Sequence, residues 1–125
     1  MTLARTVFEY AALRAVPRVE RGESVNIGVV LYCHRLDFLA VAVEVDPARL
    51  RALDPGVDVE AITVAARALQ GTCSGKGPAG QTSLGQRFRW LTAPRSTVVQ
   101  TGPAHSGLTS DPAAELTRLL AALTC

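Results

Sequence analysis

The order of apolar and polar residues divides the first third of the chain into three stretches that predict strands. Thr6–Val16 alternates between two faces and is rich in aromatic and β-branched side chains, and Pro17 ends it because proline cannot donate to a strand ladder. Val25–Cys33 is a nearly continuous apolar run, which is typical of a strand buried on both faces. Phe38–Val45 alternates again after a short turn. We expect these three strands to form an antiparallel meander.

Apolar residues at helical spacing follow the meander and return at the end of the chain. Two Asp-Pro pairs each combine a carboxylate for the N-cap with a proline that suits the first helical turn. The expected helices run from Asp46 to Leu53, from Asp58 to Gly71 and from Asp111 to the C-terminus.

The region between the last two helices is expected to form loops and two further strands. Residues 71–86 are rich in Gly and Ser and predict a loop. Arg87–Leu91 and Ser96–Thr101 are short alternating stretches that predict strands, and residues 102–110 predict another loop. The expected fold class is therefore α+β, a single domain over residues 1–125 with a mostly antiparallel sheet of about five strands and helices packed on one face.

Length and composition limit the cellular setting of the protein. A chain of 125 residues with 48% hydrophobic residues can bury a genuine core, which excludes a disordered protein. Its strongly apolar stretches are shorter than the about 20 residues of a membrane helix, and we see no secretory leader, so a cytoplasmic protein is expected. The cysteines Cys33, Cys73 and Cys125 are odd in number and form no C-x-x-C pair, which favours free thiols.

Charge is distributed unevenly along the chain. No Asp or Glu occurs between Ala61 and Ser110, although five basic residues do. Such a region would attract phosphate or an acidic partner, unless its arginines are simply solvated. Within it, Gln86–Leu91 interleaves Arg with Phe88 and Trp90, which on a strand would suit either stacking on single-stranded nucleic acid or an ordinary core. The alternation favours the core, so nucleic-acid binding is the weaker hypothesis.

The most unusual local motif is Arg21-Gly22-Glu23-x-x-Asn26-x-Gly28, at the mouth of the second strand. Arg21 and Glu23 would bind a ligand or a partner while Asn26 fixes the loop. Gly28 inside an apolar strand indicates a bulge or the close approach of another backbone. The structural alternative is an Arg–Glu pair and an Asn that hold the shape of the loop.

A second group of polar residues lies near the ends of the last predicted strands, where binding sites are often built. His105 is the member that would serve as a general base or proton carrier. The sequence contains no assembled catalytic set, which favours a protein that is not an enzyme over an enzyme, and it contains no metal-ligand spacing, so we expect no metal or other cofactor. The group consists of Arg95, Ser96, Thr97, Gln100 and His105.

The segments Tyr10–Leu31 and Pro94–Leu120, which contain both motifs, resemble the bacterial domain of unknown function family 3037. Members of that family are short, stand-alone bacterial proteins, and some are encoded beside a kinase-like protein that resembles the serine kinase toxins of bacterial persistence. The resemblance implies a protein partner and carries over no catalytic residues. It marks Arg21, Gly22, Glu23, Asn26 and Gly28 as a first signature, and Arg95, Ser96, Thr97, Gln100, His105 and Gly107 as a second.

Two functional hypotheses follow. The first is an interaction or binding module that works with a partner protein, for which a kinase-like protein is the candidate. The alternative is an enzyme or ligand-binding protein that acts on a phosphate-bearing substrate, in which an anionic ligand would meet residues of both signatures in one cleft. The residues that would converge there are Arg21, Glu23, Arg95 and His105.

Overall fold

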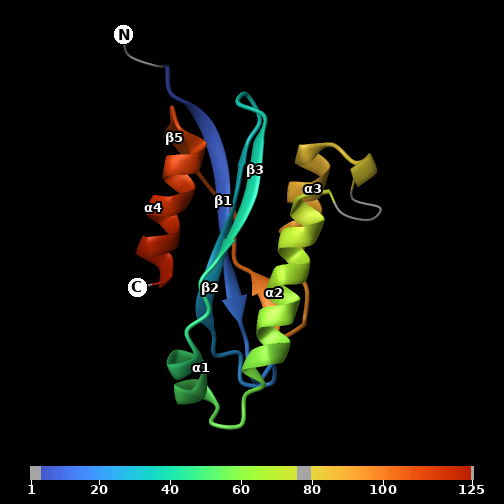
Figure 1. Ribbon diagram of the computed structural model, residues 1–125, viewed down its shortest axis with the longest axis vertical. Helices are drawn as coiled ribbons and strands as arrows, with labels where there is room; N and C mark the ends of the chain where they lie inside the picture. Colours follow the sequence, from blue (N-terminus) through green and yellow to red (C-terminus); the bar gives the residue numbers. More distant parts are fainter. Residues whose placement is uncertain (1–3, 76–79, 125) are drawn as a thin grey trace.

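A five-stranded antiparallel sheet forms the centre of the protein (Figure 1). The computed structural model describes residues 4–75 and 80–124. The sheet has the order β3-β2-β1-β4. Strand β5 also pairs with β1, on the same side of β1 as β4 but along its first half. The outer edges of the sheet are therefore β3 and the pair β4–β5. The strands are β1 (Thr6–Ala15), β2 (Val25–Cys33), β3 (Phe38–Val43), β4 (Val99–Thr101) and β5 (His105–Thr109).

Four helices in the described part of the chain complete the α+β fold, which confirms the fold class predicted from the sequence. The helices are divided between the two faces of the sheet, whereas the sequence analysis placed them on one (Figure 1). Helix α4 covers one face, α2 and α3 cover the other, and α1 lies near one end. The helices are α1 (Pro47–Leu53), α2 (Val59–Cys73), α3 (Leu84–Leu91) and α4 (Pro112–Thr124).

The central strand β2 explains why both faces are covered. Its apolar run is buried on both sides, as the sequence predicted, so each face of the sheet needs its own layer of side chains. On one face Val29 and Leu31 pack with Phe8 and Leu119 of α4. The layer on the other face includes Ala11, Leu13, Ile27, Val30, Ile62, Phe88 and Leu91.

The helix starts follow the local chemistry of the chain. The Asp46 carboxylate accepts a hydrogen bond from the backbone N–H of Ala48 at 3.0 Å, and Asp58 accepts from Ala61 at the same distance. Asp111 caps α4 in the same way through the N–H of Ala114. These contacts confirm the predicted helix starts. Helix α2 continues to Cys73, two residues past its predicted end.

The predicted strand Arg87–Leu91 is wrong, because this segment belongs to helix α3. Ser83 and Gln86 form a reciprocal capping box that starts the helix. Phe88 then lies in the core and Trp90 is 54% exposed, so the two aromatic rings do not share a face as they would on a strand. Part of the predicted loop 71–86 is likewise helical, and residues 76–79 lie outside the described structure.

The strands after α3 also differ from the prediction. Only Val99–Thr101 of the predicted strand Ser96–Thr101 pairs with β1, as β4. The predicted loop 102–110 contains β5, which pairs with the first half of β1. Both segments are short and polar, so the neighbouring strand β1 supplies the order that their own pattern does not show.

Gly28 lies at an irregularity in the pairing of β1 with β2, as the sequence predicted. The register shifts between Leu13 and Arg14, which face Gly28 and Asn26, so Ile27 is an extra residue on β2. A side chain at position 28 would collide with the carbonyl oxygen of Ala42 on β3. Gly28 therefore allows both the bulge and the close approach of the β3 backbone.

Candidate functional site

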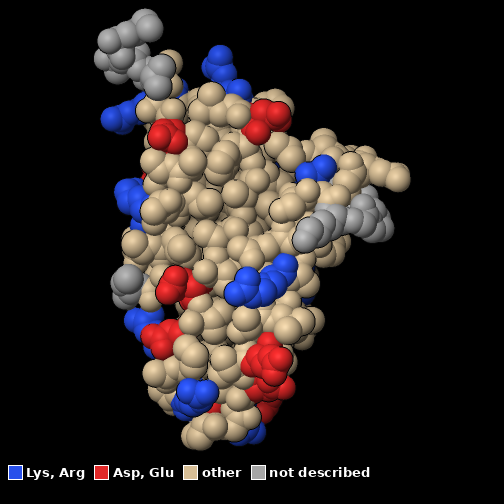
Figure 2. Space-filling model, in the orientation of Figure 1, with Lys and Arg blue, Asp and Glu red and all other residues tan. Residues whose placement is uncertain are grey.

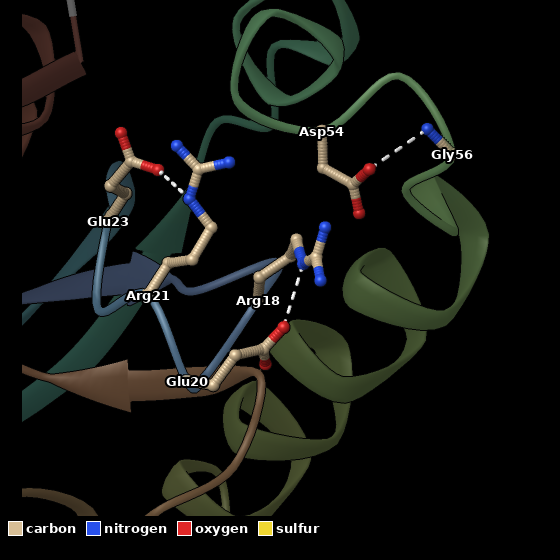
Figure 3. Close-up of polar contacts among 6 residues, drawn as sticks. All are labelled: Arg18, Glu20, Arg21, Glu23, Asp54 and Gly56. Carbon is tan, nitrogen blue, oxygen red and sulfur yellow. Dashed lines mark hydrogen bonds and ion pairs between the residues drawn. The ribbon is translucent and has the colours of Figure 1, made fainter.

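The first signature begins in the loop between β1 and β2, where its charged residues pair with one another. The Arg21 Nε and a Glu23 carboxylate oxygen lie 2.7 Å apart, and both side chains are about half exposed (Figure 3). Gly22 between them has a positive φ of 72°, which glycine adopts without strain. The arrangement agrees with the structural alternative, in which the Arg–Glu pair holds the loop.

A second ion pair lies beside the first in the same loop. Arg18 Nε contacts Glu20 at 2.7 Å, and Figure 3 shows the Arg18 guanidinium between Glu20 and Asp54. The Glu20 backbone N–H and then the Arg18 side chain lower the pKa of the Glu20 carboxyl. The hydrogen bond that Arg18 donates to the Glu20 carboxylate raises the pKa of Arg18. Both arginines of the loop thus already have acidic partners.

Asn26 belongs to the same signature, but its side chain points toward α4 and not toward the ion pairs of the loop. Its side-chain Nδ2 donates a hydrogen bond to the carbonyl oxygen of Leu123, at 3.1 Å. That carbonyl is among the last of α4, which intrahelical bonds leave unsatisfied. Asn26 therefore ties β2 to the C-terminal end of α4, on the face of the sheet that α4 covers.

The second signature is split between two places. Arg95 donates from Nη2 to the Trp90 carbonyl oxygen at 2.7 Å, and its guanidinium lies 4.8 Å from the centre of the Trp90 ring. Thr97 donates from its hydroxyl to the Val99 carbonyl oxygen. Arg95 is thus held at the end of α3, and Thr97 shapes the turn into β4, while Ser96 between them is exposed.

Gln100 and Asn26 come from different signatures, and the sheet places them in one row. Both are paired with Arg14, Asn26 from β2 and Gln100 from β4. Adjacent strands lie about 4.8 Å apart, so the row spans about 10 Å between the outer two backbones. Gln100 donates from Nε2 to the Thr97 carbonyl oxygen at 2.8 Å. The two amides are anchored, and Arg14 lies between them.

Arg14 was not among the residues singled out from the sequence. It is half-buried and makes no hydrogen bond or ion pair with the described residues. A Cβ on Gly102 would lie 2.8 Å from the Arg14 guanidinium carbon, so the guanidinium lies flat against that glycine. An arginine on the same face as Phe8, Tyr10 and Ala12 was the signal in the sequence that could have identified it.

His105 lies further along the same face of the sheet. It is opposite Tyr10, and their ring centres are 5.5 Å apart. In the next pair, the Phe8 ring lies against Gly107, where a Cβ would come within 2.8 Å of it. We call this surface the β1 strip. It consists of Tyr10, Ala12, Arg14, Gln100, Gly102 and His105, with Asn26 at its border.

Helix α4 packs mainly over β2 and β3, so the β1 strip remains partly exposed, although Tyr10 still packs against the core on that face. A guanidinium without an acidic partner is suited to binding a carboxylate or a phosphate, since its fork of N–H donors matches two oxygens. Among the described residues, no contact joins Arg21, Glu23 or Arg95 to His105. Arg14 is therefore the charged group of the strip whose chemistry suits an anion.

No three or more potential metal ligands are grouped in the described part of the chain. None of the helices within residues 4–75 and 80–124 has both the length and the apolar character needed to cross a bilayer.

The family to which the chain belongs is shown by comparison with known families. The family model described as "Protein of unknown function (DUF3037)" matches residues 10–124. No curated protein and no solved structure matches the chain. Because the match covers nearly the whole chain and both signatures, this protein belongs to the DUF3037 family of proteins of unknown function.

Proposed function

We propose that the protein is a binding module that docks an extended, acidic segment of a partner protein along β5 and the β1 strip. The observation that supports this most directly is the open edge at β5. A strand added to an exposed sheet edge gains main-chain hydrogen bonds, and neighbouring side chains then provide specificity.

The two edges of the sheet differ in whether a helix covers them. At the β3 edge, Gln70 of α2 donates from Nε2 to the Val41 carbonyl oxygen at 3.1 Å. Cys73 of the same helix also lies close to the Val41 backbone. Natural proteins often cover an edge strand with a helix, because an exposed edge invites pairing with another chain. Helix α2 therefore closes the middle of the β3 edge.

The edge at β5 has no such cover among the described residues. The N–H of Gly102 donates a hydrogen bond to the carbonyl oxygen of Ala12. The backbone N–H and C=O groups of the even-numbered residues of β1 therefore point toward this edge. The partners of these residues on β5 are His105, Gly107 and Thr109. Because antiparallel pairing alternates, Ser106 and Leu108 turn their backbone groups outward. Both residues are exposed, so a further strand has access to them.

The distribution of charged residues near β5 favours a partner segment that carries acidic side chains. The chain has no Asp or Glu between Ala61 and Ser110, a range that includes β4 and β5. Arg14 lies beside this edge without an acidic partner in the described structure. A carboxylate from the docked segment would bind its guanidinium in the geometry that arginine favours.

The partner to test first is a kinase-like protein, because the resemblance in the sequence implies that some family members are encoded beside one. The two proteins would be co-expressed and separated by size-exclusion chromatography. We expect them to elute together. We expect Ser106→Pro to abolish the complex, because proline removes the outward N–H at an edge position where the ladder to β1 does not use it. Ser106→Ala keeps that N–H and is the matched control.

Arg14→Gln tests the charged contact in the same assay. Losing a charge-assisted hydrogen bond should weaken the complex about tenfold, whereas Arg51→Ala, at an exposed position on α1, should leave it unchanged. Proteins that elute independently, or a Ser106→Pro variant that still binds, would contradict the proposal.

The alternative is a small phosphate-bearing ligand at Arg14, and the same unpaired guanidinium supports it. This alternative predicts that inorganic phosphate binds the isolated protein, that Arg14→Gln abolishes binding and that Ser106→Pro has no effect. The response to Ser106→Pro therefore separates the two functions.

A further inference from the structure

The opposite face of the sheet has an uncovered area of its own, near the turn between β2 and β3. Val7 of β1 and Leu108 of β5 are paired across the strands, and each is 57% exposed. On this face, helix α3 covers the sheet as far as Tyr32, because its buried Phe88 packs against the Tyr32 ring with 5.4 Å between the ring centres. Val7 and Leu108 therefore form an apolar floor open to solvent.

A cavity of about 360 Å³ lies over this floor. Its size falls at the lower end of the range found for small-molecule sites. The residues that line it are Arg5, Thr6, Val7, Glu9, Tyr32, His34, Arg35 and Leu108. They come from the three strands β1, β2 and β5, from the turn after β2 and from the residue before β1.

Basic groups surround the apolar floor. Arg5 and Arg35 form no ion pair or hydrogen bond with the described residues, although Glu9 lines the same cavity. Two guanidinium groups without such partners in the described structure, beside exposed apolar side chains, are suited to a ligand that is anionic at one end and apolar at the other.

His34 is the third basic residue of the cavity, and Tyr32 fixes the position of its ring. The Tyr32 hydroxyl lies 2.9 Å from Nδ1 of His34. A Cβ on Gly85 would lie only 3.1 Å from the same hydroxyl, so the start of α3 fits closely around it. When the tyrosine hydroxyl donates to Nδ1, the proton of a neutral imidazole is on Nε2, which can then donate to a ligand.

We infer that this cavity binds a small carboxylate with a short apolar chain. The carboxylate would bind Arg35, Arg5 and the His34 Nε2, and the chain would cover Val7 and Leu108. Glu9 favours a ligand with one negative charge over a phosphate dianion, because a like charge nearby is unfavourable. This site is separate from the β1 strip, which lies on the other face of the sheet.

Isothermal titration calorimetry with the full chain tests the inference, using hexanoate, acetate, hexyl phosphate and hexanol as probes. We expect hexanoate to bind more tightly than the other three. Arg35→Ala should weaken hexanoate binding about tenfold, the size expected when a charged hydrogen bond is lost. Arg51→Ala, which removes an exposed arginine of α1 that does not line the cavity, should not.

Val7→Ser supplies a second variant at an exposed position. It should weaken hexanoate binding and leave acetate binding unchanged, because it alters only the apolar floor. The inference is overturned if hexanoate does not bind, if Arg51→Ala weakens binding as much as Arg35→Ala, or if hexanol binds as well as hexanoate. Tighter binding of hexyl phosphate would overturn the assignment to a carboxylate.

Discussion

The two outer edges of the sheet differ in what lies against them. The β3 edge is apolar along its whole length, from Phe38 to Val43, and α2 holds its centre through Gln70 and Cys73. The β5 edge carries polar His105 and Ser106 beside Leu108, and in the described structure no helix covers it. Figure 2 shows a mostly uncharged surface in the centre of the view, where β3 runs between α4 and α3, with charged side chains around it.

The difference indicates which edge must be kept from pairing with another chain. An apolar edge strand without charge or proline is a template for unwanted pairing, so covering it has a structural purpose. A short polar edge is less prone to aggregate and can remain accessible to a partner. The four changes below test this comparison, from the largest expected effect to the smallest.

Gly28→Ala should be the most destabilising of these changes. The added methyl group would collide with the Ala42 backbone, which cannot move without shifting β3. We expect a loss of about 3 kcal/mol in the free energy of unfolding, measured with urea. Gly107→Ala on the open side is the matched control. Its methyl group meets the far end of the Phe8 side chain rather than a backbone, so the expected loss is smaller, about 1 kcal/mol. Equal losses would contradict the comparison.

Gln70→Leu should expose the β3 edge. The Val41 carbonyl oxygen loses its donor, which should cost about 1.5 kcal/mol of stability. The variant should also self-associate as its concentration rises, as seen by size-exclusion chromatography with light scattering. Arg67→Leu adds an apolar side chain on the same helix without releasing that carbonyl. If it associates as strongly as Gln70→Leu, added hydrophobicity rather than edge exposure is responsible.

Cys73 should make stability depend on alkaline pH. Burial raises the pKa of its thiol to about 11, while Arg87 and the Val41 backbone act in the opposite direction. The folded protein therefore keeps a proton that the unfolded chain loses above its lower, ordinary pKa. Stability is fully present below that ordinary value and falls as pH rises toward 11, by about 1 kcal/mol near pH 10. Urea unfolding of Cys73→Ser should show a smaller loss over this range, and an identical loss would rule out Cys73 as its source.

Leu108→Lys should have the smallest effect on the isolated protein. The side chain is exposed at the open edge, so we expect a change within about 0.5 kcal/mol. Val41→Lys places the same charge at the covered edge, where the side chain packs against the core, and should be clearly more destabilising. Thermal unfolding of both variants decides the point, and similar melting temperatures would mean that the edges are equally open.

The sequence predicted the meander and the helix starts because their causes are local. Alternation marks β1 and β3, continuous apolar character marks β2, and an aspartate caps a helix through its own neighbours. It failed at α3, where Phe88 and Trp90 alternate over too few residues to distinguish a strand from a helix. The capping box of Ser83 and Gln86 was the overlooked signal.

The candidate site was less predictable than the fold. Arg21 and Glu23 were conspicuous as a motif, yet they pair within their own loop. Arg14 was inconspicuous in an apolar strand, and only its neighbours on β2 and β4 give it a context. Pairings between residues 14, 26 and 100 depend on the register of three strands, which no local pattern specifies.

The sequence by itself determined an α+β chain of this family, with strands and capped helices where local spacing and chemistry were strong. The tertiary structure alone decided that α4 covers the opposite face from α2 and α3, that β5 forms on the free side of β1, and that α2 closes one edge while the other stays open. These features depend on which elements lie against each other, and that is set by burial summed over the whole sheet, which is not encoded in any short stretch of residues.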